Sequence, residues 1–312
     1  MSLRQSSRDF SMNLLIIKLG ATGDVVRTTP LLKKLGGRIT WIAAAKNLPL
    51  LQGLQENLRS LSWEQRHLAK AASYDLVLNL EDTLEAAQFA HALKFKRLFG
   101  AGLDGDGRLS YSEDSRGWFD LSLISRFGQK QADRLKLENR RTYQDLIFTG
   151  LGFPFNGETY LLPTPAKTDL AGDIAIASEA GPVWPMKHWA YYDLLKQKLE
   201  AEGLSVNILP RRPTLLEHLD DVMNHRCLVG GDTLPMHLAL GAGIPCVTVF
   251  NCTSPWEIHE YGIQKKLVSP RLAEFFYQRG FDERATRAIG IEEVFNAVKQ
   301  QLEAAHPCRN SR

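Results

Sequence analysis

The chain has 312 residues, enough for two domains of ordinary size, and it is 44% hydrophobic and 23% charged. These proportions exclude a disordered chain, a collagen-like chain and a small disulfide scaffold. Lys and Arg number 38 against 35 Asp and Glu, so the formal net charge of +3 is too weak to indicate nucleic acid as the main partner. No apolar run reaches the roughly 18 residues that a membrane-spanning helix needs.

The first half alternates short apolar runs, typical of buried parallel strands, with helical periods. The strands are predicted over 13–18, 38–45, 75–79 and 96–100, and the helices over 23–35, 83–93 and 142–150. Residues 101–141 are rich in glycine and then in charge, and they show little periodicity.

A dense group of prolines with one glycine at 153–165 indicates a linker. Beyond it, strands are predicted over 173–178, 204–209, 226–230 and 245–250, and helices over 188–202, 214–224, 233–243 and 291–304. The sequence therefore predicts an α/β protein with parallel sheets in two Rossmann-like domains, 13–160 and 170–312. We expect a ligand site in a cleft between these domains, at the C-terminal ends of the strands.

Targeting and redox signals are sparse. The residues before the first strand lack the apolar core of a signal peptide, and Met12 is a candidate natural start. No two cysteines have CxxC spacing among Cys227, Cys246, Cys252 and Cys308. We therefore expect a cytoplasmic protein that needs neither a metal ion nor a cofactor.

The turn after the first strand holds the first chemical signal. Gly20 and Gly23 permit a tight turn, but Val26 stands where a dinucleotide fingerprint needs its third glycine. Asp24 lies at the start of the following helix, where a carboxylate is either a helix cap or a general base at the floor of the cleft.

Two further signals lie in the second half. Asp232 and Thr233 follow a strand and precede a helix, whose unpaired N–H groups suit a phosphate. His237 lies early in that helix, where a single histidine is more often structural than catalytic. Lys187 follows the first strand of the second domain and is either a solvated lysine or a cation that neutralises a diphosphate.

Three segments, in this order, resemble glycosyltransferase family 9: LGATGDVVRTTPLL from Leu19, KHW from Lys187, and GDTLPMHLALGAGIPCVTVFNCTSPWEIHEYG from Gly231. The best-known members of this family are the bacterial ADP-heptose:lipopolysaccharide heptosyltransferases. The resemblance covers about 13–305. It implies a GT-B fold of two facing Rossmann-like domains, and inverting, metal-independent transfer from a nucleotide sugar, with ADP-heptose the favoured donor.

The resemblance also implies roles for single residues. Asp24 matches the catalytic aspartate, and Lys187 matches the lysine that contacts the donor phosphates. Donor-binding roles are implied for Gly23, Lys187, Asp232, Thr233, Met236, His237 and Thr253. Two departures lie near this donor site: Leu234 replaces a glycine, and Asn251-Cys252 replaces Gly-Pro.

The stretch from Arg126 to Arg141 carries six basic residues against two acidic ones. Such a stretch is either a solvated face or a surface for an anionic partner. The resemblance implies an anionic inner-core glycolipid as acceptor and peripheral contact with the inner face of the cytoplasmic membrane. From the excess of positive charge in this stretch, we expect Arg134, Lys136, Arg140 and Arg141 to contact the acceptor.

Three alternatives remain open: a transferase of the same fold that acts on another glycan or on a protein, an NAD-binding oxidoreductase, and a non-catalytic protein that binds sugar nucleotides. The missing third glycine counts against the oxidoreductase. The joint presence of Asp24 and Lys187 counts against the non-catalytic protein.

Overall fold

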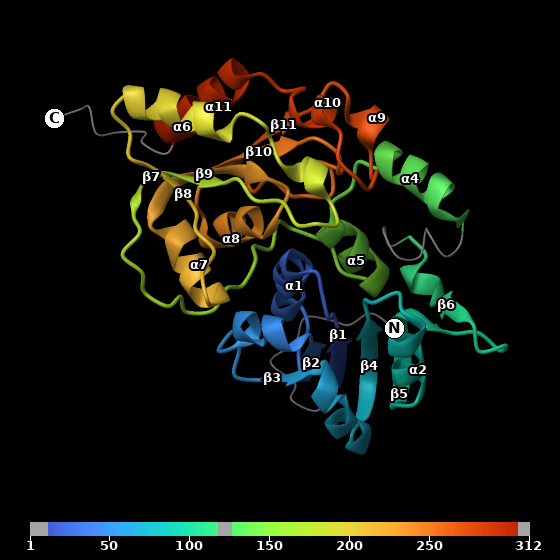
Figure 1. Ribbon diagram of the computed structural model, residues 1–312. Helices are drawn as coiled ribbons and strands as arrows, with labels where there is room; N and C mark the ends of the chain where they lie inside the picture. The colour runs from blue at the N-terminus through green and yellow to red at the C-terminus, as the bar shows by residue number, and fades with distance from the viewer. Residues whose placement is uncertain (1–11, 118–126, 305–312) are drawn as a thin grey trace. The chain divides into compact units, whose positions relative to one another are not determined.

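The computed structural model describes residues 12–117 and 127–304 (Figure 1). The chain divides between Pro163 and Thr164 into two compact units, each with its own sheet. Among the described residues, no helix combines the length and the apolar character needed to span a bilayer. Arg126 and Cys308 lie outside the described residues.

The sheet of the N-terminal unit has six strands in the order β3-β2-β1-β4-β5-β6. Strands β1 to β5 pair in parallel, and β6 runs antiparallel to β5. Because β2 lies on one side of β1 and β4 on the other, the ends of β1 and β4 form the switch point at which such sheets bind ligands. The strands are β1 Asn13–Ile17, β2 Arg38–Ala43, β3 Leu58–Ser62, β4 Ser73–Asn79, β5 Lys94–Leu103 and β6 Leu109–Tyr111.

Helices cover both faces of this sheet. Alternate side chains of a strand point to opposite faces, so Ile16 packs with Phe148 of α5, while Ile17 packs in a second cluster with Phe89 of α2. The α-helices are α1 Thr22–Thr28, α2 Leu84–His91, α4 Gln129–Glu138 and α5 Tyr143–Leu151. The 3-10 helices are η1 Thr29–Lys33, η2 Ala45–Leu51, η3 Trp63–Ala71 and η4 Glu113–Ser115.

The C-terminal unit has a parallel five-stranded sheet in the order β11-β10-β9-β7-β8, and its switch point lies between β7 and β9. Its strands are β7 Gly172–Ala177, β8 Val206–Ile208, β9 His225–Gly231, β10 Cys246–Phe250 and β11 Gln264–Val268. Its helices are η5 Pro185–Lys187, α6 Tyr192–Ala201, α7 Leu215–Met223, α8 Leu234–Ala242, α9 Leu272–Phe275, α10 Glu283–Thr286 and α11 Ile291–Ala304. Within this unit, α6 and α11 lie on one face of the sheet, and α7 and α8 lie on the other (Figure 1).

Two predicted helices differ from the observed ones, and one stretch without a predicted element proves to be structured. The helix expected over 23–35 ends as an α-helix at Thr28, because Pro30 has no N–H to donate to the carbonyl of Val26, and it continues as η1. The helix expected over 188–202 begins only at Tyr192. The stretch 101–141, which shows little periodicity, contains the end of β5, strand β6 and the ten-residue helix α4.

The chain is anchored on each side of the division between the units. The N–H of Leu161 donates to Thr29 Oγ1 of the N-terminal unit at 2.8 Å. In the C-terminal unit, the N–H of Ala166 donates to the carbonyl of Leu216 at 3.1 Å, and the N–H of Thr168 donates to Asp220 Oδ2 at 2.7 Å. Residues 162–165 lie between these anchors.

Candidate active site

Charged side chains gather at the switch point of the N-terminal unit. Ile17 pairs with Asn79, so the residues that follow β1 and β4 emerge at the same edge of the sheet. Lys18 Nζ lies 3.1 Å from Glu81 Oε1 and 3.7 Å from Asp24 Oδ2. Burial lowers the pKa of Lys18, but the carboxylates of Asp24 and Glu81 outweigh this effect and raise the pKa above its ordinary value.

Asp24 is the third residue of α1, and its contacts bear on the two roles that the sequence leaves open. Its Oδ2 accepts the N–H of Ala21 at 3.3 Å, which is a capping contact, and its Oδ1 lies 2.9 Å from Arg27 Nη2. The side chain is nevertheless 29% exposed, so a substrate hydroxyl can reach it. Lys18 and Arg27 place two positive charges beside this carboxylate.

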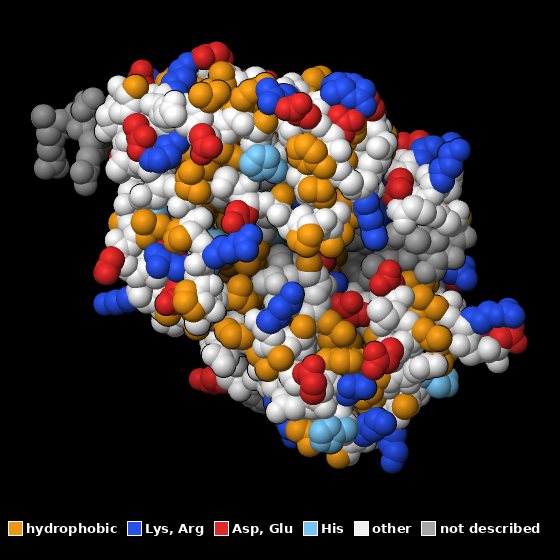
Figure 2. All heavy atoms as spheres, viewed as in Figure 1, with side chains coloured by type: hydrophobic (Ala, Val, Ile, Leu, Met, Phe, Trp, Pro, Cys, Tyr) orange, Lys and Arg blue, Asp and Glu red, His pale blue; other side chains and the backbone are white. Residues whose placement is uncertain are grey.

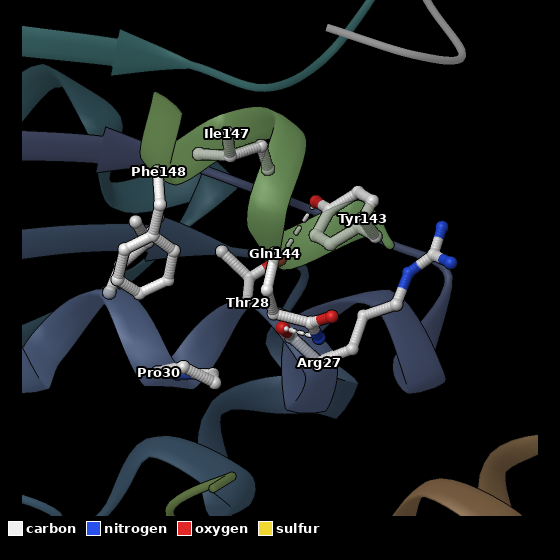
Figure 3. A pocket seen from close by; sticks show the side chains of 8 residues that line it. Arg27, Thr28, Pro30, Tyr143, Gln144, Ile147 and Phe148 are labelled. Atoms are coloured by element: carbon white, nitrogen blue, oxygen red, sulfur yellow. Dashed lines mark hydrogen bonds between the residues drawn. The ribbon is translucent and has the colours of Figure 1, made fainter. Parts of the chain in front are cut away.

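Arg27 is held against α5. Its guanidinium lies 4.0 Å from the centre of the Tyr143 ring, and its carbonyl accepts Gln144 Nε2 at 2.8 Å. The Tyr143 hydroxyl lies 2.9 Å from Thr28 Oγ1. These four residues line a small pocket between α1 and α5 (Figure 3). Burial raises the pKa of Tyr143 to about 12, so this hydroxyl stays neutral near pH 7.

The sequence reasoning missed Glu81. Its Oε1 accepts the N–H groups of Leu19 at 2.7 Å and Gly20 at 3.3 Å, in addition to pairing with Lys18. Glu81 therefore holds the turn between β1 and α1 from the neighbouring strand. The available signal was a carboxylate placed just beyond an apolar strand.

In the C-terminal unit, polar side chains gather beyond β7, β9 and β10. Lys187 Nζ donates to the carbonyl of Asp232 at 2.7 Å and to its Oδ2 at 2.9 Å. Thr253 Oγ1 donates to the same Oδ2 at 2.8 Å. The backbones at Gly231 and Lys187 also lie close together, because a Cβ at Gly231 would lie 2.4 Å from the carbonyl oxygen of Lys187. The structure thus brings together three of the residues expected to bind the donor.

Electrostatics hold Asp232 in its ionised form. Burial raises the pKa of its carboxyl, but Lys187, His237 and the hydrogen bonds of Lys187 and Thr253 together lower it to about 2. The ion pair of Lys187 with Asp232 is formally neutral. Asp232 thus holds the Lys187 ammonium in a fixed orientation.

Three buried polar atoms beside this cluster have no hydrogen-bond partner within the described part of the chain: Thr233 Oγ1, Asn251 Oδ1 and Ser254 Oγ. Asn251 is fixed by its other amide atom, Nδ2, which donates to the carbonyls of Met186 at 3.1 Å and His188 at 2.9 Å. A buried polar atom without a partner costs about 1–3 kcal/mol. A ligand that supplies hydrogen bonds at the ends of β9 and β10 would remove this cost.

The remaining residues expected to bind the donor are placed differently. Gly23 lies on α1 in the N-terminal unit, whereas the Lys187 cluster belongs to the C-terminal unit, which has a separate sheet. Met236 and His237 are buried in α8, where their side chains are 1% and 5% exposed. Their roles in donor binding remain predictions.

The residues expected to bind the acceptor lie in α4 and just after it. Arg134, Arg140 and Arg141 are exposed, whereas Lys136 is only 4% exposed and is not part of a solvated face. Arg141 Nε pairs with Asp145 at 2.6 Å. On the face shown in Figure 2, basic and acidic side chains are interspersed.

Within residues 12–117 and 127–304, no group of three or more His, Cys, Asp or Glu residues is placed to hold a metal ion. The Asp-Gly-Asp sequence at 104–106 lies in the turn between β5 and β6, where Asp104 Oδ1 accepts two backbone N–H groups of that turn. The cysteines of the described residues are buried free thiols, namely Cys227, Cys246 and Cys252.

Residues 183–275, which include Lys187, Asp232 and Thr253, match the model of glycosyltransferase family 9 (heptosyltransferase). The resemblance predicted from the sequence motifs is confirmed over this segment, and it supports a glycosyltransferase. The comparison with curated proteins gave no match.

Solved structures resemble the chain over both units. The E. coli heptosyltransferase WaaC with ADP-2-deoxy-2-fluoro heptose is 16% identical, with 94% of this chain and 99% of that chain covered and a TM-score of 0.60. A family 9 glycosyltransferase from Veillonella parvula DSM 2008 is 14% identical, with 96% and 99% covered and a TM-score of 0.61. The E. coli ADP-heptose lps heptosyltransferase II is 15% identical, with 94% and 99% covered and a TM-score of 0.57. This likeness concerns the fold, and it confirms the predicted GT-B class.

Proposed function

We propose that this chain, which carries the pattern of glycosyltransferase family 9 over residues 183–275, is an inverting, metal-independent glycosyltransferase. In this proposal it moves a heptose or a related sugar from an ADP-sugar to a hydroxyl of a lipopolysaccharide inner-core acceptor. The observation that carries the proposal is the cluster of Lys187, Asp232 and Thr253 at the ends of β7, β9 and β10.

The groups around this cluster suit a nucleoside diphosphate. An oriented ammonium and two buried hydroxyls that have no partner within the described part of the chain (Thr233 and Ser254) can donate hydrogen bonds to phosphate oxygens, and the N-terminus of α8 adds positive potential. The WaaC structure contains an ADP-heptose analogue, which favours an ADP-sugar as the donor here.

The proposed reaction uses one carboxylate and one cation. Asp24 accepts the proton of the acceptor hydroxyl while the hydroxyl oxygen bonds to C1 of the sugar. The bond from C1 to the diphosphate breaks, and its electron pair leaves with ADP. Attack opposite the leaving group inverts C1, and Lys187 with the N-terminus of α8 stabilises the charge that develops on the diphosphate.

We assign the acceptor to an anionic glycolipid on the basis of the exposed Arg134, Arg140 and Arg141. Such an acceptor would bring the protein to the inner face of the cytoplasmic membrane as a peripheral protein, because basic side chains are attracted to anionic lipid surfaces.

A thermal-shift series with ADP-heptose, a GDP-sugar and a UDP-sugar tests the donor. Ligands stabilise the folded state by mass action, so we expect ADP-heptose to raise the Tm most. Lys187→Ala should lose this shift, whereas Lys265→Ala, which removes an exposed lysine of β11, should keep it. An equal shift in both variants, or no shift with any nucleotide sugar, would contradict the proposal. Transfer to a Kdo-bearing lipid acceptor, followed by mass spectrometry, then tests the reaction.

A further inference from the structure

We propose that Glu81 is a positioning residue that controls both the place and the proton affinity of Asp24, and that it acts through Lys18 and the backbone of the turn between β1 and α1. The inference rests on the proposed function, in which Asp24 is the general base. No contact between Glu81 and the substrate is required.

Glu81 is itself firmly held. Its N–H donates to Asn79 Oδ1 at 3.3 Å, and Asn79 Nδ2 donates to the carbonyl of Ala101 on β5 at 2.9 Å. Asn79 is fully buried, and the Glu81 side chain is 14% exposed. The carboxylate of Glu81 is thus fixed relative to the central strands of the sheet.

This fixed carboxylate holds the turn that carries Asp24. Glu81 Oε1 accepts the N–H groups of Leu19 and Gly20, and Asn47 Nδ2 donates to the carbonyl of Leu19 at 2.7 Å. The turn is therefore tied to two neighbouring segments at its start. At its end, Asp24 Oδ2 accepts the N–H of Ala21, so the place of the base depends on the place of the turn.

The same carboxylate balances the charge around Asp24. Among the titratable groups around Asp24 in the described elements are Lys18 after β1, Arg27 on α1 and the neutral Tyr143 hydroxyl on α5. Glu81 pairs with Lys18 and so offsets part of the positive charge that acts on Asp24. Without Glu81, the positive charge of Lys18 would be offset by Asp24 alone. Asp24 would then bind a proton less readily and would be a weaker base.

Two substitutions should therefore act in opposite directions. Glu81→Gln keeps an oxygen for the turn but removes the balancing charge, so the protonation midpoint of Asp24 should fall by about one pH unit. Lys18→Gln removes the cation, so the midpoint should rise by a similar amount. Glu85→Gln, on the exposed first turn of α2, is the matched control and should leave the midpoint unchanged.

The midpoint can be measured directly on the full chain by ¹³C NMR of labelled aspartate carboxyls, with the Asp24 signal identified by its loss in Asp24→Asn. The acid limb of the pH–rate profile with ADP-heptose and a Kdo-bearing lipid should move in the same directions. A purely structural role for Glu81 would lower the Tm of Glu81→Gln and leave both readouts in place, which would overturn the inference. Full activity of Asp24→Asn would instead show that Asp24 is not the general base. That part of the proposed function and this inference would then both be wrong.

Discussion

Asp24 serves the local fold, and in the proposed reaction it serves the chemistry as well. It accepts the N–H of Ala21 as part of the helix start, it pairs with Arg27, and it keeps 29% of its side chain exposed. Because the helix contact uses only a hydrogen-bond acceptor, an amide can replace the carboxylate there without loss of the cap. The basic function, by contrast, needs the ionised carboxylate.

Asp24→Asn should therefore lower turnover at least 100-fold, since general base catalysis contributes about 10²–10⁴-fold. The affinity for ADP should change little, because the residues assigned to the diphosphate belong to the C-terminal unit. Steady-state kinetics and calorimetry with ADP check the two halves of this prediction. A rate near that of the wild type would rule Asp24 out as the base.

Asp232 should make stability depend on pH in acid. Its pKa in the folded chain is about 2, below its ordinary value of 3.8, so the unfolded chain binds more protons between these values. The resulting stabilisation, about 2 kcal/mol, is complete above about pH 4 and is lost as the pH falls towards 2.

The difference in unfolding free energy between the wild type and Asp232→Asn should therefore be largest near neutral pH and shrink below pH 4. Urea unfolding followed by tryptophan fluorescence at several pH values measures it. Asp193→Asn, on an exposed site of α6, should show no such trend. A constant difference across the pH range would mean that Asp232 acts through packing rather than charge.

At the scale of elements, α4 is a helix that hydrophobic periodicity does not predict. The helix has few apolar residues, and its own side chains pair along it, as Gln129 Nε2 does with Asp133 at 2.7 Å. It presents Arg134 to solvent, but it buries Lys136, so the basic surface is narrower than the sequence implies.

Replacing Arg134, Arg140 and Arg141 together by glutamine should raise the KM for an anionic acceptor and leave the KM for the donor unchanged. Each basic residue near an anionic surface contributes about 1 kcal/mol, and salt screens the effect. The wild-type KM for the acceptor should accordingly rise with ionic strength. A control variant loses three exposed basic residues at the starts of other strands, namely Arg38, Arg59 and Lys94. If both triple variants behave alike, the stretch is an ordinary solvated face.

The elements that the sequence predicts best are the central strands, because β1, β4, β7 and β10 are buried on both faces and read as continuous apolar runs. Of the edge strands, β3, β6 and β11 carry polar side chains and gave no prediction, whereas β8 was predicted over 204–209. The candidate site residues likewise divide into those that the sequence predicts and those that it does not. Residues within one loop, such as Asp232 and Thr233, can be found by spacing. The contact of Glu81 with Lys18 depends on the register of strands about 60 residues apart, which a single sequence does not contain.

For the whole molecule, the account of the leaving group predicts that activity survives chelation. Lys187 and the N-terminus of α8 supply the positive potential in the proposed reaction, so EDTA should leave the rate unchanged. Loss of activity with EDTA and its recovery with magnesium, manganese or iron would mean that a cation takes over this role.

The two units also allow a division of labour to be tested. Lys187, Asp232 and Thr253 belong to the C-terminal unit, which has its own hydrophobic core. Residues 164–312 alone should bind ADP within about tenfold of the full chain, which is 1.4 kcal/mol. The same fragment with Lys187→Ala should bind more weakly. A folded fragment that does not bind ADP would mean that the N-terminal unit contributes to the donor site.

The anchors on either side of the division have a consequence for encounter kinetics. From Leu161, bonded to Thr29, to Ala166, bonded to Leu216, the chain takes five steps, which span at most about 18 Å when fully extended. A linker of this length keeps each unit at an effective concentration of the order of millimolar relative to the other. Two of its four residues, Pro163 and Pro165, also restrict its conformations. The two units therefore meet as parts of one chain and cannot diffuse apart.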